Sequence, residues 1–302
     1  MLSDNASPST GREENNTSEI FEFLSAIRNK DKEKLKNLRF AEEEYVVTLN
    51  GMEYKLKNLG GGKAEICEFI THTSDITVPA SLDNKKIIGI GKNACYGQHS
   101  LKSLTLSNDI LYIQPGAFAN CINLKKIILN SKLRTLGETN ETAKGTPLFL
   151  KNHYLGVFAN SAIESIDLPE SLEIIGDNTF RGCGNLKTIK LPNRIKKISN
   201  YCFFNCQRLE QILFPKELYE IENGAFYGCK SLNMVRMPGS LKKIKHFAFQ
   251  NCNNLTQIVF NDGVKEIGVS AFRGCKKLAK LNLPLSVLNI HKYSFEKNIL
   301  LE

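Results

Sequence analysis

The segment LEQILFPKELYEIENGAFYGCKS, residues 209–231, decides the fold because its pattern recurs along most of the chain. Counted from Leu209, apolar residues stand at positions 1, 4 and 6, Pro at position 7, and aliphatic residues at positions 10 and 13. A small residue and Phe follow at positions 17 and 18, and Cys stands at position 21. The frame restarts at Leu101, Leu124, Ile163, Leu186, Leu232, Leu255 and Leu278, and from Leu186 onward the spacing is a constant 23 residues.

Each repeat has the features of one turn of a solenoid. Alternating apolar residues at positions 4 and 6 predict a short strand with one buried face. Pro at position 7 cannot donate a ladder hydrogen bond, so it ends the strand and turns the chain. One repeat buries too few apolar side chains to offset its conformational entropy, whereas stacked repeats cover one another. The sequence therefore predicts a stacked array with the Phe of position 18 at its centre.

The consensus L-x-x-I-x-L-P-x-x-L-x-x-I-G-x-x-A-F-x-G-C resembles the BspA-like leucine-rich repeat, also called the Treponema pallidum-type repeat. The resemblance is closest at residues 209–231 and 255–277 and extends over residues 73–302. It implies a β-rich, curved solenoid of about nine coils, without enzymatic activity. It also implies an adhesin-like surface or secreted protein that binds other proteins.

Composition and the N-terminus leave the location open. Hydrophobic residues make up 42% of the 302 residues and charged residues 24%, as in globular proteins. No apolar run approaches the ~20 residues that cross a bilayer. The start, MLSDNASPSTGREENNTSE, has no basic region followed by an apolar one, so no secretory signal peptide is predicted. The alternative to a surface protein is an intracellular interaction scaffold that starts at Met1.

Three further segments precede the array. Residues 1–17 are polar, which predicts a disordered tail. Residues 18–40 have the apolar spacing of an amphipathic helix, with Ser18 as its cap. Residues 41–72 alternate apolar and polar side chains around Asn50-Gly51, a strong hairpin signal. They predict a small β-meander that caps the first coil.

The coil that starts at Leu124 contains an insertion of roughly residues 138–155. Its Phe158 lies 34 residues after Leu124, where the other coils place Phe after 17. The insertion ends in apolar and aromatic residues, among them Phe149 and Tyr154. These side chains either pack back on the flank of the coil or form an exposed anchor for a protein partner.

The sequence indicates no catalytic, metal or cofactor site. The nine cysteines are odd in number, and one per coil at position 21 predicts a column of buried, reduced thiols. The five histidines fall at unrelated positions, and no C-x-x-C motif is present. Gly60-Gly61-Gly62-Lys63 lacks the spacing of a P-loop and predicts a turn. We therefore expect a protein that is not an enzyme and binds no cofactor or small molecule.

Positive charge is concentrated on the array. Residues 73–302 hold 30 Lys and Arg against 18 Asp and Glu, whereas residues 1–72 have a net charge of −3. Lysines at positions 11 and 12 are expected to face solvent, and a second group of lysines stands at the strand positions 2, 3 and 5. These lysines either serve solubility or bind an acidic protein partner; the absence of interleaved aromatic residues argues against nucleic acid. The candidate partner-binding residues are Lys196, Lys197, Lys242, Lys243, Lys187 and Lys190, together with Phe149 and Tyr154.

Overall fold

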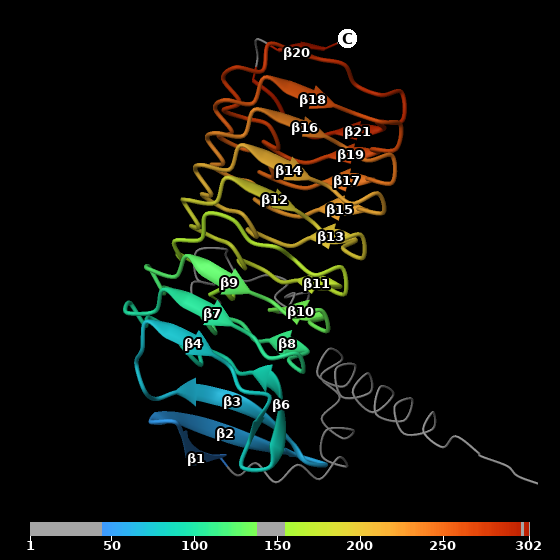
Figure 1. Ribbon diagram of the computed structural model, residues 1–302. Coiled ribbons are helices and arrows are strands. Elements are labelled where there is room, and N and C mark those ends of the chain that lie inside the picture. The colour runs from blue at the N-terminus through green and yellow to red at the C-terminus, as the bar shows by residue number, and fades with distance from the viewer. Residues whose placement is uncertain (1–43, 138–154, 297–298, 302) are drawn as a thin grey trace, which may run out of the picture.

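The computed structural model describes residues 44–137, 155–296 and 299–301. Within these ranges the chain winds into a β-solenoid of about nine turns of about 23 residues, which confirms the predicted fold class (Figure 1). The coils stack along one axis, with the N-terminal strands at one end and the C-terminus at the other. The expected tail of residues 1–17, the expected helix of residues 18–40 and the insertion residues 138–154 lie outside the described residues.

The first strand of a coil lies at positions 3–5, as the alternation of apolar residues predicted, in every coil except the one that starts at Ile163. These strands form one column of the solenoid (Figure 1). They are β4 (Asp75–Thr77), β7 (Ser103–Thr105), β9 (Lys126–Ile128), β12 (Thr188–Lys190), β14 (Gln211–Leu213), β16 (Met234–Arg236), β18 (Gln257–Val259) and β20 (Lys280–Leu281), which pairs with β22 (Leu300–Leu301).

A second, shorter strand at positions 12 and 13 forms the other column. Its members are β6 (Lys85–Ile90), β8 (Tyr112–Ile113), β10 (Thr135–Leu136), β11 (Ile174–Ile175), β13 (Lys197–Ile198), β15 (Glu220–Ile221), β17 (Lys243–Ile244), β19 (Glu266–Ile267) and β21 (Asn289–Ile290). A two-residue strand, β5 (Ser81–Leu82), pairs antiparallel with β6. The repeat sets the register, because Ile198 pairs in parallel with Ile221 and Ile221 with Ile244.

Three longer strands stand before the first coil: β1 (Glu44–Leu49), β2 (Met52–Gly60) and β3 (Lys63–Phe69). They pair antiparallel in sequence order, and β3 then pairs in parallel with β6 of the first coil. Asn50 and Gly51 join β1 to β2 with φ angles of 51° and 77°, the left-handed conformation that a tight hairpin turn requires. This unit therefore extends the second column of strands by three.

A column of stacked phenylalanine rings runs through the core at position 18. Successive rings have centroids 5.0–5.9 Å apart; the residues are Phe118, Phe158, Phe180, Phe203, Phe226, Phe249, Phe272 and Phe295. In the first coil Cys95 takes the place of Phe, and Phe69 of β3 lies 6.0 Å from the ring of Phe118. The central Phe is thus present in every coil after the first, and Phe69 of β3 supplies the first ring of the column.

The four coils of residues 186–277 also alternate with a period of two. Strands of the first column pair as β12 with β14 and as β16 with β18, whereas β14 and β16 belong to separate sheets. The sequence alternates in step, with Leu191, Phe214, Met237 and Phe260 at position 6. Position 12 carries Lys197, Glu220, Lys243 and Glu266 in the same order. A consensus of one 23-residue repeat averages over these two kinds of coil. It therefore does not show the alternation.

Candidate functional site

The cysteines of position 21 are hydrogen-bond donors within the core. Each thiol donates to the backbone carbonyl of position 18 in the preceding coil, with Sγ to oxygen distances of 3.0–3.2 Å; the donors are Cys121, Cys183, Cys206, Cys229, Cys252 and Cys275. In the first coil Gln98 replaces Cys and donates its Nε2 to the oxygen of Phe69 at 2.8 Å. Cys is thus a residue small enough for the turn at position 21, and its thiol supplies the hydrogen bond that a buried backbone carbonyl needs.

A hydrogen bond with Cys95 lowers the pKa of Cys121. Burial raises the pKa of the other five column thiols and keeps them protonated. It raises the pKa of Cys183 to about 11 and that of Cys275 to about 12. Since the thiolate is the nucleophile, these five cysteines are poor candidates for catalysis or redox chemistry. All nine cysteines are free thiols, and eight of them are buried.

We expect native-state thiol titration near neutral pH to modify few cysteines and titration after denaturation to modify nine. The carbonyl hydrogen bonds and the burial of the sulfur atoms both oppose reaction in the native state. Cys67, the partly exposed thiol in β3, should react first, and slowly, because burial and Glu65 raise its pKa to about 12. Disulfides in non-reducing mass analysis, or several fast-reacting thiols, would contradict this assignment.

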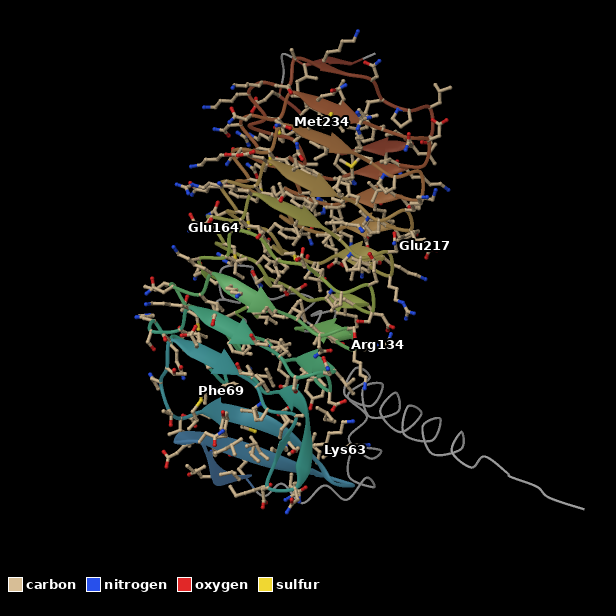
Figure 2. All side chains as sticks on the ribbon, viewed as in Figure 1. Lys63, Phe69, Arg134, Glu164, Glu217 and Met234 are labelled. Atoms are coloured by element: carbon tan, nitrogen blue, oxygen red, sulfur yellow. The ribbon has the colours of Figure 1, made fainter. Side chains whose placement is uncertain are left out.

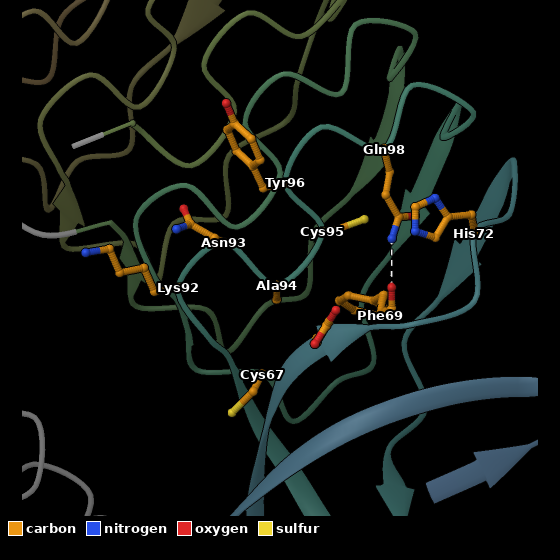
Figure 3. Close-up of a pocket in the computed structure, with 10 residues that line it drawn as sticks. Cys67, Phe69, His72, Lys92, Asn93, Ala94, Cys95, Tyr96 and Gln98 are labelled. Carbon is orange, nitrogen blue, oxygen red and sulfur yellow. Dashed lines mark hydrogen bonds between the residues drawn. The ribbon is translucent and has the colours of Figure 1, made fainter. Parts of the chain in front are cut away.

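A cavity of about 260 Å³ lies between β3 and the first coil (Figure 3). Cys67, His72, Lys92 and Gln98 are its chemically interesting lining residues. The Gln98 amide already bonds to Phe69, as the dashed line in Figure 3 shows, and the Cys67 thiol has a raised pKa. Among the described residues no group of three or more His, Cys, Asp or Glu could hold a metal ion. The raised pKa of Cys67 therefore makes it a poor nucleophile near neutral pH.

The Gly60-Gly61-Gly62 run is a turn between β2 and β3, with φ angles of 75°, 54° and 70°. These left-handed conformations explain the glycines, because other residues adopt them at a cost. The run connects two antiparallel strands and does not lead into a helix, as a phosphate-binding loop would.

The lysines of position 12 belong to a ladder of opposite charges on the second column. Lys197 Nζ lies 3.0 Å from Glu222 Oε1 and 3.7 Å from Glu220 Oε2. Lys245 Nζ lies 3.1 Å from Glu220, and Lys243 Nζ lies 3.6 Å from Glu266. Position 12 is partly exposed, with 35% of the Lys197 side chain and 44% of the Lys243 side chain accessible to solvent. It does not form a purely basic stripe, because stacking places a glutamate of the next coil beside each of these lysines.

Position 11 presents cations with an exposed aromatic side chain between them. Lys196 is 70% exposed, and its Nζ lies 4.0 Å from Glu217, the limit of an ion pair. Lys242 is half-buried and forms no ion pair with the acidic residues that the structure describes. Tyr219 lies on the intervening coil, is 48% exposed and is held by backbone hydrogen bonds to Lys196 and Lys242. The expectation that no aromatic residue is interleaved with the lysines is therefore wrong at position 11, where Tyr219 stands between Lys196 and Lys242, a signal already visible in the sequence.

On the first column, Lys187 and Lys190 are exposed. Lys190 Nζ lies 3.4 Å from Glu170, and Leu213, the strand partner of Lys190, is 62% exposed. Phe149 and Tyr154 lie outside the described residues. The structure thus places Lys196 and Lys242 on one edge of the solenoid, Lys197 and Lys243 in the ladder, and Lys187 and Lys190 on the first column.

The fold and its motif define a leucine-rich repeat protein. The family model for the BspA type leucine rich repeat region matches residues 73–140, 154–253 and 219–302, in six copies. The chain therefore belongs to the BspA-type leucine-rich repeat family. The residues that the structure describes include no helix long and apolar enough to span a membrane.

Solved structures with a similar fold include other leucine-rich repeat proteins. One from T. pallidum shares 25% identity over 72% of this chain and 83% of that chain, with a TM-score of 0.49. One from Eubacterium ventriosum shares 16% identity over 81% and 80%, with a TM-score of 0.38. One from Bacteroides ovatus shares 20% identity over 85% and 99%, with a TM-score of 0.34. No curated protein matches the chain significantly.

Proposed function

We propose that this protein is a non-enzymatic, adhesin-like interaction protein whose array binds an acidic protein partner. The observation that carries the proposal is the surface formed by Lys196, Tyr219 and Lys242 on consecutive coils. Exposed tyrosine flanked by cations is typical of binding hot spots, since the ring supplies contact area and the cations steer an acidic partner. Backbone hydrogen bonds of 2.7 and 2.8 Å between these coils hold the three residues in place before binding.

A second candidate is an intracellular interaction scaffold that uses the same surface. Nine free cysteines favour it, because extracellular proteins more often pair their cysteines. The two candidates differ in the partner and not in the binding residues. Affinity capture should be run in parallel with lysate of the source cell and with extracellular proteins. The wild-type array and the double variant Lys196→Glu, Lys242→Glu serve as baits.

The proposal expects acidic proteins that are captured by the wild type and lost with this double variant. The matched control is Lys102→Glu, Lys125→Glu, which changes the net charge equally at other exposed positions. The surface formed by Lys196, Tyr219 and Lys242 is called the position 11 surface. Loss of the same proteins with both variants, or with neither, would contradict binding at this surface. Capture only from the extracellular sample favours the adhesin, and capture only from the lysate favours the scaffold.

With an identified partner, Lys196→Glu with Lys242→Glu should slow association several-fold at low salt and leave dissociation nearly unchanged. Exposed charges contribute under about 1 kcal/mol each and act mainly on the association rate. Lys197→Glu with Lys243→Glu should instead lower the melting temperature, because Lys197→Glu places a third carboxylate beside Glu220 and Glu222. Kinetic traces at two salt concentrations, together with thermal melts, separate these outcomes. An unchanged association rate for the first variant would show that its lysines only solubilise the protein.

The insertion of roughly residues 138–155 is a separate part of the proposal. Phe149 and Tyr154 are proposed as apolar anchors, whose removal speeds dissociation and leaves the salt dependence unchanged. The same kinetic traces therefore distinguish the insertion from the lysines.

A further inference from the structure

A second basic surface runs along the edge of the solenoid where each coil turns from the cysteine column into the first-column strand. This corner ridge consists of positions 22, 23 and 2 of five consecutive turns. Its residues are Gly184, Asn185, Lys187, Gln207, Arg208, Glu210, Lys230, Ser231, Asn233, Asn253, Asn254, Thr256, Lys276, Lys277 and Ala279, all at least partly exposed. Apart from one residue, Glu210, the charged members are cations, and most of the others are amides or hydroxyls.

The cations of the corner ridge are not neutralised. Lys187, Arg208, Lys230, Lys276 and Lys277 form no ion pair with any acidic residue in the part of the chain that the structure describes. The position 12 ladder differs here, since glutamates of neighbouring coils pair with its lysines. In Figure 2, nitrogen-tipped side chains project from the edge near Glu164, opposite the edge marked by Glu217.

Backbone hydrogen bonds between coils fix the spacing of the ridge. Glu210 N donates to Lys187 O at 2.8 Å, and Asn254 N donates to Lys230 O at 3.2 Å. Arg208 Nη1 donates to Asn185 Oδ1 of the preceding turn at 3.2 Å, which orients the guanidinium. Stacked strands advance ~4.8 Å per coil, so the five turns of the ridge span about 20 Å. Four of these turns carry a cation, at position 2, 22 or 23, and the turn of Asn253, Asn254 and Thr256 carries none.

We propose that the corner ridge binds a linear anionic polysaccharide along the solenoid axis. A line of unpaired cations matches a polymer that carries sulfates or carboxylates along its length, and the amide side chains between the cations can hydrogen-bond its hydroxyl groups. The ridge has no aromatic or large aliphatic side chain, so it lacks the anchors of a protein hot spot and the stacking platforms of a nucleic-acid groove. The inference concerns a different edge from the position 11 surface and does not depend on the proposed protein partner.

The test is a binding titration of the full chain with a heparin-derived decasaccharide. We expect the ridge variant Arg208→Gln, Lys230→Gln, Lys276→Gln, Lys277→Gln to raise the Kd at least about tenfold, because each exposed ion contact contributes a few-fold. The matched control, Lys196→Gln, Lys216→Gln, Lys242→Gln, Lys265→Gln, loses the same net charge on the opposite edge and should change the Kd less than about twofold. Thermal melts of both variants verify that they fold as the wild type does.

Other outcomes overturn the inference. Equal weakening by both variants would show attraction by net charge alone, and absence of wild-type binding would exclude the polysaccharide. A polyglutamate decapeptide or a single-stranded oligonucleotide that binds the ridge more tightly than the decasaccharide would assign it to a peptide or a nucleic acid. Because the control variant includes Lys196 and Lys242, loss of the protein partner and loss of the polysaccharide are read from different variants.

Discussion

Replacement of Phe226 by Ala should lower the free energy of unfolding by about 3–5 kcal/mol, the cost typical of a buried aromatic ring. The Phe226 side chain is fully buried, and its ring stacks on Phe203 at 5.2 Å and on Phe249 at 5.0 Å between centroids. Its removal opens a cavity in the middle of the array, and the neighbouring rings are held by their own coils. The two halves of the phenylalanine column then lose contact with each other.

Urea denaturation followed by circular dichroism measures this loss. The matched control is Phe247→Ala in the next coil, since that ring is 37% exposed and stands outside the phenylalanine column. We expect the control to cost about 1 kcal/mol or less, as for surface substitutions. Equal losses for the two variants would contradict the assignment of Phe226 to the core position of the repeat.

Gly156→Ala should destabilise the protein by about 3 kcal/mol, at the upper end of the usual cost of overpacking. A Cβ atom at Gly156 would lie 1.9 Å from the backbone oxygen of Asn178 and 2.3 Å from the nitrogen of Thr179. Both atoms belong to the backbone of the next coil. Relief of the clash therefore requires separation of two stacked coils rather than rotation of a side chain.

Gly184→Ala is the matched control, because its Cβ would meet nothing closer than the oxygen of Gly182 at 3.9 Å. This substitution should change stability by less than about 0.5 kcal/mol, as for surface sites without special features. Equal melting temperatures for Gly156→Ala and the wild type would show that the two coils do not approach as closely as the structure indicates.

The hydrophobic pattern of one repeat was sufficient to predict most of the fold. Residues such as Ile212, Ile221 and Phe226 are buried where positions 4, 13 and 18 were expected to be. The Asn50-Gly51 turn also lies where the sequence predicted it. These features depend on the residue type and on neighbours close in sequence, so a single coil contains the information. The helix of residues 18–40 and the anchors Phe149 and Tyr154 stay predictions.

The charged surface could not be predicted in the same way. Lys196 and Lys197 are adjacent in sequence, yet Lys196 is exposed at the edge and Lys197 is paired with Glu220 and Glu222. The alternation of lysine and glutamate at position 12 is visible in the sequence only when coils are read in pairs. Its effect depends on the distance between side chains of neighbouring coils, which a one-coil consensus does not contain.

By itself the sequence determined that the chain stacks repeats, which residues enter the core, and that positive charge belongs to the array. Only the tertiary structure decided which of those charges remain available to a partner. The physical reason is that burial follows from the local pattern of apolar residues, whereas charge neutralisation requires groups within about 4 Å of each other. Stacking brings residues one repeat apart to that distance: Lys197 meets Glu220, while Lys230 and Lys276 on the corner ridge meet no described carboxylate.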